Sequence, residues 1–500
     1  MKTEKTKVGF VRGLLLLGMA LMIPCYLFTA GNTLLAPWDL YPVRSRPVLL
    51  VLTACCLALL VVLMRAVGKH EAFFERHENR VLAGAAVFYF AVQMLMAQAL
   101  RFVPITDLEQ CFTAAGSLAD TGAFAQSERS FIYFTRYPHN LGIVYLFSGI
   151  FRFFGLFGWA DRLMQGILVC SLLFTLGLLA SARLCKKMGG VKAEVRFLFL
   201  CATCLPFLYC TTELYTDAFS LAFPSMIVYS FAKAKEAETP HGKLLFALLF
   251  GVLSFAGAQL RFTSVIAAIA CLIAALFDKR VRLTLLLFVL LALSFVAGGT
   301  AMNHVNDRLL GLDNIEKNKL PILHYVAMGL PVQVDEGYGR YGTGGWLIFS
   351  TSIEDPQERK DALLEEVIDR IYTVRYPHKL LHMMRRKNIS TFGDGTFMLN
   401  EIMEGDAHEP DNLIKQVIFT QGKAYPAYYH LTPAMFAAQM LLACLACFQA
   451  VCRKDNRAAA LFISLLGIFL FLCMWESRGR YFFQYEMLLL CAAAQARVRE

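Results

Sequence analysis

The sequence has 500 residues, of which 57% are hydrophobic and only 17% are charged, and its formal net charge is +10. This much apolar surface does not fit a water-soluble core and is typical of a protein with many membrane-spanning helices. Most of the basic residues lie in short segments between apolar runs, where they indicate orientation, so a nucleic-acid partner is not expected.

Apolar runs of near-spanning length predict an all-α polytopic membrane protein with about twelve transmembrane helices. The first run follows a basic N-terminus, and we interpret it as a retained signal anchor. The predicted spans are 10–30, 47–66, 82–101, 161–182, 194–210, 217–233, 244–260, 262–277, 283–302, 431–451, 458–475 and 480–497.

The basic segments between the spans predict the topology, because Lys and Arg in short loops favour the cytoplasmic side. From a cytoplasmic N-terminus, all of these segments stay inside only if the apolar stretch Asn140 to Gly158 does not cross the membrane. We therefore predict an interfacial or re-entrant helix there, with the remaining polar residues gathered on the extracytoplasmic face. The basic segments are 65–80, 183–192, 233–243, 279–282 and 453–457.

This topology divides the chain into three parts. Residues 1–302 form an N-terminal transmembrane region with a large outer loop at about 102–160, residues 303–430 an extracytoplasmic segment, and residues 431–500 the last transmembrane helices. The outer segment contains no cysteine, and most of the 15 cysteines lie in apolar runs. The cysteines are therefore expected to pack in helices and not to form disulfides or a metal site.

The outer loop begins with Asp107 and Glu109 on a segment whose apolar residues recur at helical spacing. This pattern predicts an amphipathic helix along the membrane surface, with Asp107 near its N-terminus. One interpretation is helix capping, because Thr106 and Glu109 match a capping box. The other is catalysis. A sugar on a polyprenyl phosphate already carries a good leaving group, so its transfer needs one base, Asp107, which Glu109 would assist.

A departing phosphate also needs cations, and Arg suits it best because of its forked donors. The candidate substrate-binding residues on the same face are Arg136, His139, Arg261, Arg478, Arg480 and Tyr481. These residues also have interpretations other than substrate binding. The arginines would snorkel to lipid headgroups, and the histidine would form a hydrogen bond with the backbone.

Glu213 and Asp217, four residues apart, form a candidate acidic site. They would share a helix face and hold a divalent cation, or they would end two helices at water. Two carboxylates alone do not decide between Mg²⁺, Ca²⁺ and the absence of a metal, so no cofactor is certain.

Three motifs together resemble the GT-C superfamily of membrane glycosyltransferases. They are Asp107-Leu108-Glu109 in an outer loop, the Arg136 to Asn140 stretch Arg-Tyr-Pro-His-Asn, and the late Glu-x-Arg-x-Arg-Tyr that ends at Tyr481. Within it, the chain is similar to family 39, the protein O-mannosyltransferases and aminoarabinose transferases. The resemblance implies sugar transfer from a polyprenyl-phosphate donor to a glycan, lipid or protein acceptor, at the outer face of a cell membrane, with Asp107 at the catalytic acidic position.

The chain departs from this family in two ways. It has Asp-Leu-Glu where members often have adjacent acidic residues or a second aspartate, and the segment 303–430 matches no acceptor-binding domain.

Two further classes stay open. A transporter or flippase of a lipid-linked sugar would place ionisable residues inside the membrane, where Glu486 is the main candidate. A polysaccharide polymerase or ligase would depend more on the outer arginines than on Asp107, and its product would grow by whole glycan blocks.

Overall fold

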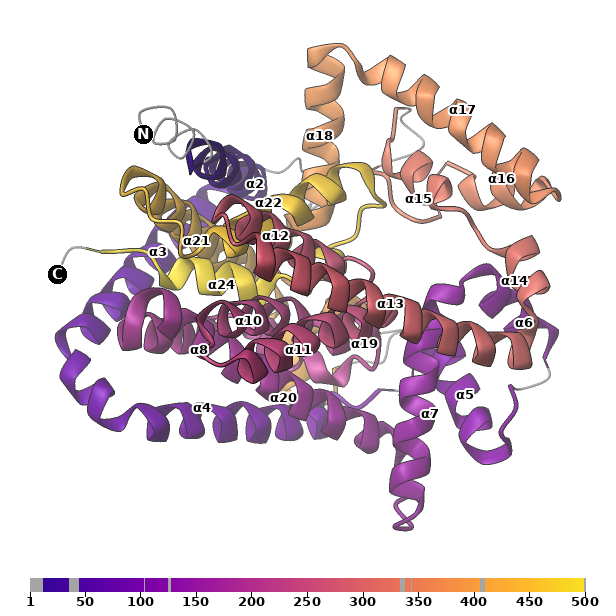
Figure 1. The fold of residues 1–500 in the computed structure, drawn as a ribbon, viewed down its shortest axis with the longest axis horizontal. Coiled ribbons are helices and arrows are strands. Elements are labelled where there is room, and N and C mark those ends of the chain that lie inside the picture. The colour runs from indigo at the N-terminus through magenta and orange to yellow at the C-terminus, as the bar shows by residue number, and fades with distance from the viewer. Residues whose placement is uncertain are drawn as a thin grey trace.

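The computed structural model describes residues 12–35, 45–102, 104–124, 127–332, 338–342, 344–404 and 410–498. Every regular element in these ranges is a helix, which confirms the predicted all-helical fold class (Figure 1). Seven helices are long and apolar enough to cross a membrane, and α22 (Ala459–Met474) and Phe262–Phe277 are shorter apolar helices. The seven are Arg12–Leu35, which includes α2 (Met22–Leu35), α3 (Arg46–Lys69), α4 (Glu71–Ala99), α8 (Arg162–Thr203), α11 (Pro240–Leu260), α13 (Val281–Leu310) and α21 (Tyr425–Cys452).

Two of the predicted spans, 161–182 and 194–210, fall together in α8, a stretch of 42 residues. At Gly190 the backbone leaves the helical region, with φ 76° and ψ −172°, so two helical pieces meet there at a kink. Glycine permits this because it has no Cβ that would clash at positive φ. The two predicted spans are therefore joined by a kink at Gly190 and not by an extended loop.

Other predicted spans are broken into shorter pieces. The span 217–233 consists of α9 (Thr216–Ser220) and α10 (Phe223–Glu236), and the span 480–497 consists of α23 (Arg480–Phe483) and α24 (Glu486–Ala494). The helix α10 packs against α8, α11 and α12 (Ser264–Phe277), whereas α24 packs between α8 and α21. These short helices are held by their neighbours in the bundle, which compensates for their length.

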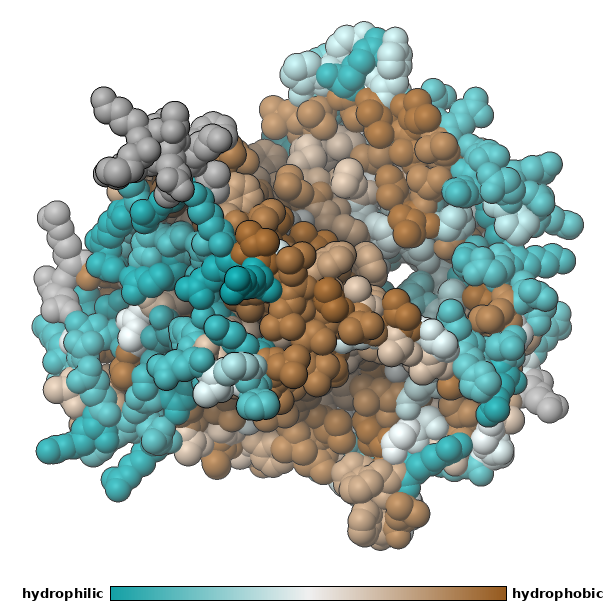
Figure 2. All heavy atoms as spheres, viewed as in Figure 1, coloured by the Kyte–Doolittle hydropathy of each residue, from teal (hydrophilic) through white to brown (hydrophobic). Residues whose placement is uncertain are grey.

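Hydrophobic side chains form a broad band across the molecule, as Figure 2 shows. Hydrophilic residues gather on the side that holds both chain termini and again on the opposite side. Many large apolar residues of α3, α4 and α13 are exposed, which suits a surface in contact with lipid.

The outer loop folds into α5 (Thr106–Thr121), α6 (Glu128–Arg136), the 3₁₀ turn η1 (Pro138–Asn140) and α7 (Leu141–Gly155). The helix α5 buries Leu108, Cys111 and Ala115 and packs against α7, which agrees with the predicted amphipathic helix. At 15 residues α7 is too short to span, and in Figure 1 it lies across the direction of α4 and α13. This placement agrees with the predicted interfacial helix.

Every regular element described in the segment 303–430 is a helix, and the predicted helix near 361–372 lies within α17 (Pro356–Val374). The helices α15, α16, α17 and α18 share a small core that includes Ala327, Trp346, Leu363 and Met383. The bounds of its helices are α14 (Leu312–Asn318), α15 (Ile322–Gly329), α16 (Trp346–Ser352), α17 (Pro356–Val374), α18 (Pro377–Phe392), α19 (Leu399–Glu404) and α20 (Leu413–Ile418).

Candidate functional site

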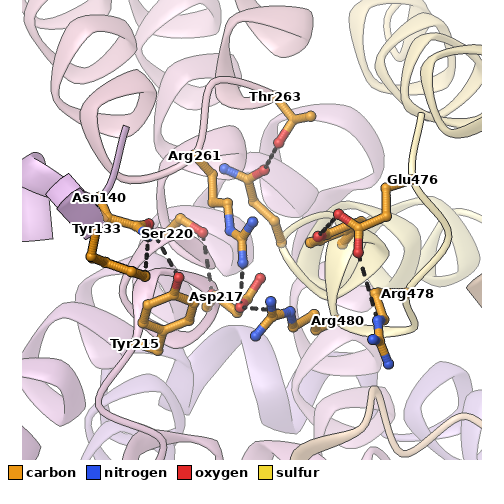
Figure 3. Close-up of polar contacts among 12 residues, drawn as sticks. Tyr133, Asn140, Tyr215, Asp217, Ser220, Arg261, Thr263, Glu476, Arg478 and Arg480 are labelled. Atoms are coloured by element: carbon orange, nitrogen blue, oxygen red, sulfur yellow. Dashed lines mark hydrogen bonds and ion pairs between the residues drawn. The ribbon is translucent and has the colours of Figure 1, made fainter. Parts of the chain in front are cut away.

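Three chain segments meet at one end of the apolar helices and bring polar side chains together (Figure 3). They are the turn that enters α9, the C-terminal end of α11, and the loop between α22 and α23. Asp217 lies in the first turn of α9, Arg261 directly follows α11, and Arg480 begins α23. The end of an apolar helix thus supplies each charged group.

Asp217 is the centre of this cluster. Its side chain is 2% exposed, and its Oδ2 lies 2.5 Å from Nη2 of Arg261 and 3.7 Å from Nε of Arg480. The two guanidinium side chains are 20% and 17% exposed, so they reach solvent although their shared carboxylate does not. One carboxylate balances only one of the two cations, which leaves the arginine pair ready to accept an anion.

Two tyrosine rings flank the arginine pair. The Arg261 guanidinium lies 5.7 Å from the ring centroid of Tyr215 and 4.9 Å from that of Tyr481, and Arg480 lies 5.3 Å and 5.6 Å from the same rings. Cation–π attraction at these distances orients both guanidinium groups. The Tyr481 hydroxyl also donates to Oε2 of Glu476 at 2.6 Å, which fixes its ring.

The arginine pair has unused hydrogen-bond capacity. Among the described residues, Arg261 donates one hydrogen bond, to Asp217, while Arg480 donates none. The Nε atoms of both side chains are buried without a hydrogen-bond partner in that part of the chain. Because a guanidinium carries five N–H donors, several remain for a ligand with multiple oxygen atoms.

Asp107 accepts the last of three linked side-chain hydrogen bonds. Its Oδ1 accepts from the Tyr133 hydroxyl at 2.9 Å, and that hydroxyl accepts from Nδ2 of Asn140 at 2.7 Å. The Tyr215 hydroxyl donates to Oδ1 of Asn140 at 3.1 Å. Burial and then the neighbouring Tyr215 raise the pKa of Tyr133, so its hydroxyl keeps the proton that it donates to Asp107.

The prediction that Thr106 and Glu109 form a capping box is wrong. The N-cap residue of α5 is Ile105, and no side chain caps this helix. Thr106 lies in the left-handed region with φ 51°, which is unfavourable for a β-branched residue and costs about 1–3 kcal/mol. Such strain directly before Asp107 is typical of positions held for function.

Asp107, His139 and the arginine pair act on one another electrostatically. The charges of Asp107, Arg261 and Arg480 all act on His139. Desolvation by the surrounding protein, followed by the charge of Arg261, lowers the pKa of His139 to about 4, although the residue is exposed. His139 is therefore neutral at pH 7, and its ring meets Tyr137 and Tyr325 edge to face.

Glu213 is buried beside Asp217, but the two carboxylates do not share a helix face as predicted. Glu213 precedes α9 in a turn and is completely buried, and neither of its oxygens has a hydrogen-bond partner among the described residues. Burial and the charge of Asp217 raise the pKa of Glu213 to about 8. Within the described ranges no group of three or more His, Cys, Asp or Glu side chains could hold a metal ion. Asp217 faces two guanidinium groups, so this pair does not fit a cation.

Three predicted site residues lie outside the cluster. Arg478 lies 3.6 Å from the carboxylate of Glu476 and donates to the Tyr341 carbonyl at 3.2 Å. Arg136 ends α6, and its charge, after burial, contributes to the lowered pKa of Arg359. Glu109 is exposed, about 200° around α5 from Asp107.

Sequence reasoning missed Tyr133, Asn140, Tyr215 and Glu476 as site residues. Asn140 ends the Arg-Tyr-Pro-His-Asn motif, and Tyr215 lies between Glu213 and Asp217. Closeness to predicted residues was the one signal for these two. No sequence pattern marks Tyr133, because its hydroxyl reaches Asp107 through the packing of α6 against α5.

Comparison with solved structures found two crystal structures of ArnT from Cupriavidus metallidurans. One is bound to undecaprenyl phosphate, with 11% sequence identity and a TM-score of 0.32, and the other is in the apo state, with 11% identity and a TM-score of 0.31. Each match covers 83% of this chain and 76% of the ArnT chain. Comparison with curated proteins found no match.

A family sequence model covers almost the whole chain, from residue 41 to residue 498. Its description, together with the seven long apolar helices, places the protein in a membrane that it crosses several times. The chain belongs to this family, CHIM_prot, described as "Conserved hypothetical integral membrane protein".

Proposed function

We propose that this protein transfers a sugar from a polyprenyl-phosphate donor to an acceptor hydroxyl at the extracytoplasmic face of the membrane. The observation that carries the proposal is the pair Arg261 and Arg480, which share Asp217 and keep unused donors. A phosphate ester has the charge and the several oxygens that would fill those donors. The pair lies at the end of apolar helices, where the phosphate of a membrane-anchored lipid would also lie.

In the proposed reaction Asp107 is the general base. It takes the proton of the acceptor hydroxyl while the acceptor oxygen bonds to the anomeric carbon of the sugar. The bond between that carbon and the phosphate oxygen breaks, and its electron pair stays on the phosphate. Arg261 and Arg480 stabilise the charge that develops there, so the reaction needs no general acid.

The hydrogen bonds around Asp107 support its role. The donor chain from Tyr215 through Asn140 to Tyr133 holds the carboxylate in one orientation. Because the pKa of His139 is lowered to about 4, this residue would contact the sugar or the acceptor as a neutral ring. These contacts agree with the family 39 resemblance, in which Asp107 occupies the catalytic acidic position. The acceptor, whether glycan, lipid or protein, is not part of the proposal.

The proposal is tested with the full chain in liposomes that contain a panel of radiolabelled polyprenyl-phosphate sugars. We expect Asp107→Asn to lower label transfer by about 10²- to 10⁴-fold, the usual effect of a general base. Donor binding, measured separately, should stay close to that of the wild type. The matched control is Asp120→Asn on the same helix, because the Asp120 carboxylate binds Arg162 instead. Unchanged transfer in Asp107→Asn would contradict the assigned base.

A transporter of the lipid-linked sugar is the second candidate, favoured by Glu486. This residue begins α24 and is completely buried, and neither of its carboxylate oxygens has a hydrogen-bond partner among the described residues. Buried ionisable groups of this kind occur in transport pathways. Movement of the labelled donor between the leaflets of the same liposomes, without transfer to any acceptor, would favour the transporter. Transfer of preassembled glycan blocks would favour the polymerase or ligase.

A further inference from the structure

A separate cavity lies at the far end of the bundle from the arginine pair. Its volume is about 330 Å³, and its walls come from α8 next to the Gly190 kink, the connection between α21 and α22, and the chain after α24. The helix α22 joins Ala458, in the cavity wall, to Trp475, beside the candidate site. Its 16 residues separate the two places by about 24 Å.

The cavity carries an excess of positive charge. Five basic side chains line it, together with one acidic side chain. Asp455 is occupied by Arg457 at 2.6 Å, and Lys192 is paired with Glu71 at 2.8 Å. Two further basic side chains of the lining, Arg453 and Arg497, belong to neither of these pairs.

Both of these arginines are available to a ligand. Among the described residues, the side chains of Arg453 and Arg497 form no ion pair and no hydrogen bond, and both are exposed. Guanidinium groups held at one cavity attract an anion more strongly than isolated surface charges do. The observation that distinguishes this place from ordinary surface charge is the cavity between them.

The cavity wall is built from defined contacts. Nε2 of Gln449 donates to the carbonyl of Arg497 at 2.8 Å, and the Arg497 amide donates back to Oε1 of Gln449 at 2.7 Å. Arg196, which is 8% exposed, donates to the carbonyls of Met64 and Ala496 at 3.2 Å each. These bonds fasten the end of the chain to α21 and α8, so Arg497 has a fixed place in the wall.

One side of the lining is apolar. Ala446, Ala450, Ala458 and Phe462 cover the side formed by α21 and α22. A lining with cations on one part and alanines on another fits a ligand with an anionic group and a short carbon skeleton. A volume of about 330 Å³ lies at the small end of the range for ligand pockets, which is about 300–1,000 Å³.

We propose that this cavity binds a small phosphate ester, through Arg453 and Arg497. A phosphodiester headgroup of an anionic phospholipid and a free phosphate ester share the chemistry that these guanidinium groups recognise. The proposal does not depend on sugar transfer at the other end of the bundle.

The test uses the full chain in detergent with two probes. Dioleoylphosphatidylglycerol, compared with dioleoylphosphatidylcholine, is followed by native mass spectrometry, and radiolabelled glycerol 3-phosphate is followed by equilibrium dialysis. We expect saturable binding of one equivalent of at least one probe, weakened at least about tenfold in R453Q/R497Q. The matched control is R76Q/R80Q, which removes two exposed charges of α4 that do not line the cavity.

The two probes distinguish the two sources of the phosphate. Binding of phosphatidylglycerol alone assigns the cavity to a lipid headgroup, and binding of glycerol 3-phosphate assigns it to a soluble ester. The variant R453K/R497K keeps the charge and should keep more binding than the glutamine pair, provided that both variants elute as the wild type does in gel filtration. The proposal is overturned if neither probe binds, or if R76Q/R80Q weakens binding as much as R453Q/R497Q.

Discussion

Arg478 and Arg480 lie two residues apart in the chain, but their surroundings differ. Arg480 shares Asp217 with Arg261 and donates no hydrogen bond among the described residues, whereas Arg478 is held by Glu476 and the Tyr341 carbonyl. We expect Arg480→Gln to weaken binding of a polyprenyl-phosphate sugar about 10- to 100-fold, through the loss of charge-assisted hydrogen bonds. Arg478→Gln should weaken it less than about threefold. Equal losses, measured by donor titration, would contradict this assignment.

Glu213 gives a prediction about pH. Burial and Asp217 raise its pKa to about 8 in the folded protein, against an ordinary value of 4.5. Between these values the unfolded chain has released the proton that the folded chain still holds, so the folded state loses stability as the pH rises. The unfolding temperature should therefore fall from pH 5 to pH 8, and less steeply in Glu213→Gln, which cannot titrate.

Scanning fluorimetry at one fixed heating rate checks this prediction. The control is Glu109→Gln, which changes an exposed carboxylate and should keep the slope of the wild type. Parallel curves for wild type and Glu213→Gln would show that Glu213 does not titrate in this range.

At this scale the sequence predicts types of residue better than their pairings. Arg261, Arg480 and Asp217 are recognisable because they are charged residues at the ends of apolar runs. Their meeting depends on how α9, α11 and α23 pack, which periodicity does not encode. Tyr133 and Asn140 are neutral, so no charge pattern marks them, although they form the contacts of Asp107.

Among the elements, α18 connects the outer helices to the candidate site. Nζ of Lys387, which is 2% exposed, donates to the carbonyls of Gly329 at the end of α15 and Trp475 at the end of α22. Lys387→Met would leave both buried carbonyls without this donor, at a cost of about 1–3 kcal/mol each. We expect a lower unfolding temperature and weaker donor binding, because Trp475 directly precedes Glu476.

Lys379→Met is the matched control on the same helix, because that lysine is exposed and only its ammonium group lies over the Tyr376 ring. It should change both measurements little. If the two variants behave alike, α18 does not hold the loop after α22.

Helices were predictable to different degrees for physical reasons. Long apolar runs such as those of α3 and α13 predict their helices directly, because each run is long enough to cross a bilayer. The short helix α23 follows Gly479 and packs against α9, α18 and α22, whereas α24 packs against α8 and α21. The predicted spans 161–182 and 194–210 lie on the two sides of Gly190 in α8, where a kink and not a polar loop separates the two helical pieces.

At the scale of the whole molecule, the band of apolar surface separates two polar ends, and the predicted topology assigns them to opposite sides of the membrane. The end with the termini contains Cys452, which is exposed, and the other end contains α17, where Lys360 is exposed. If the basic loops are cytoplasmic, a maleimide that cannot cross membranes should label Lys360→Cys in intact spheroplasts. It should reach Cys452 only after permeabilisation.

The labelling is read by comparing wild type, Lys360→Cys and a Cys452→Ser background, because Cys55 is also exposed on α3. Label at Cys452 in intact spheroplasts, with none at position 360, would invert the topology. It would then place Asp107 and the arginine pair in the cytoplasm, where the proposed donor sugar would not meet them. The same result would put the cavity at Arg453 and Arg497 outside. Orientation therefore decides which phosphate each end of the molecule can meet.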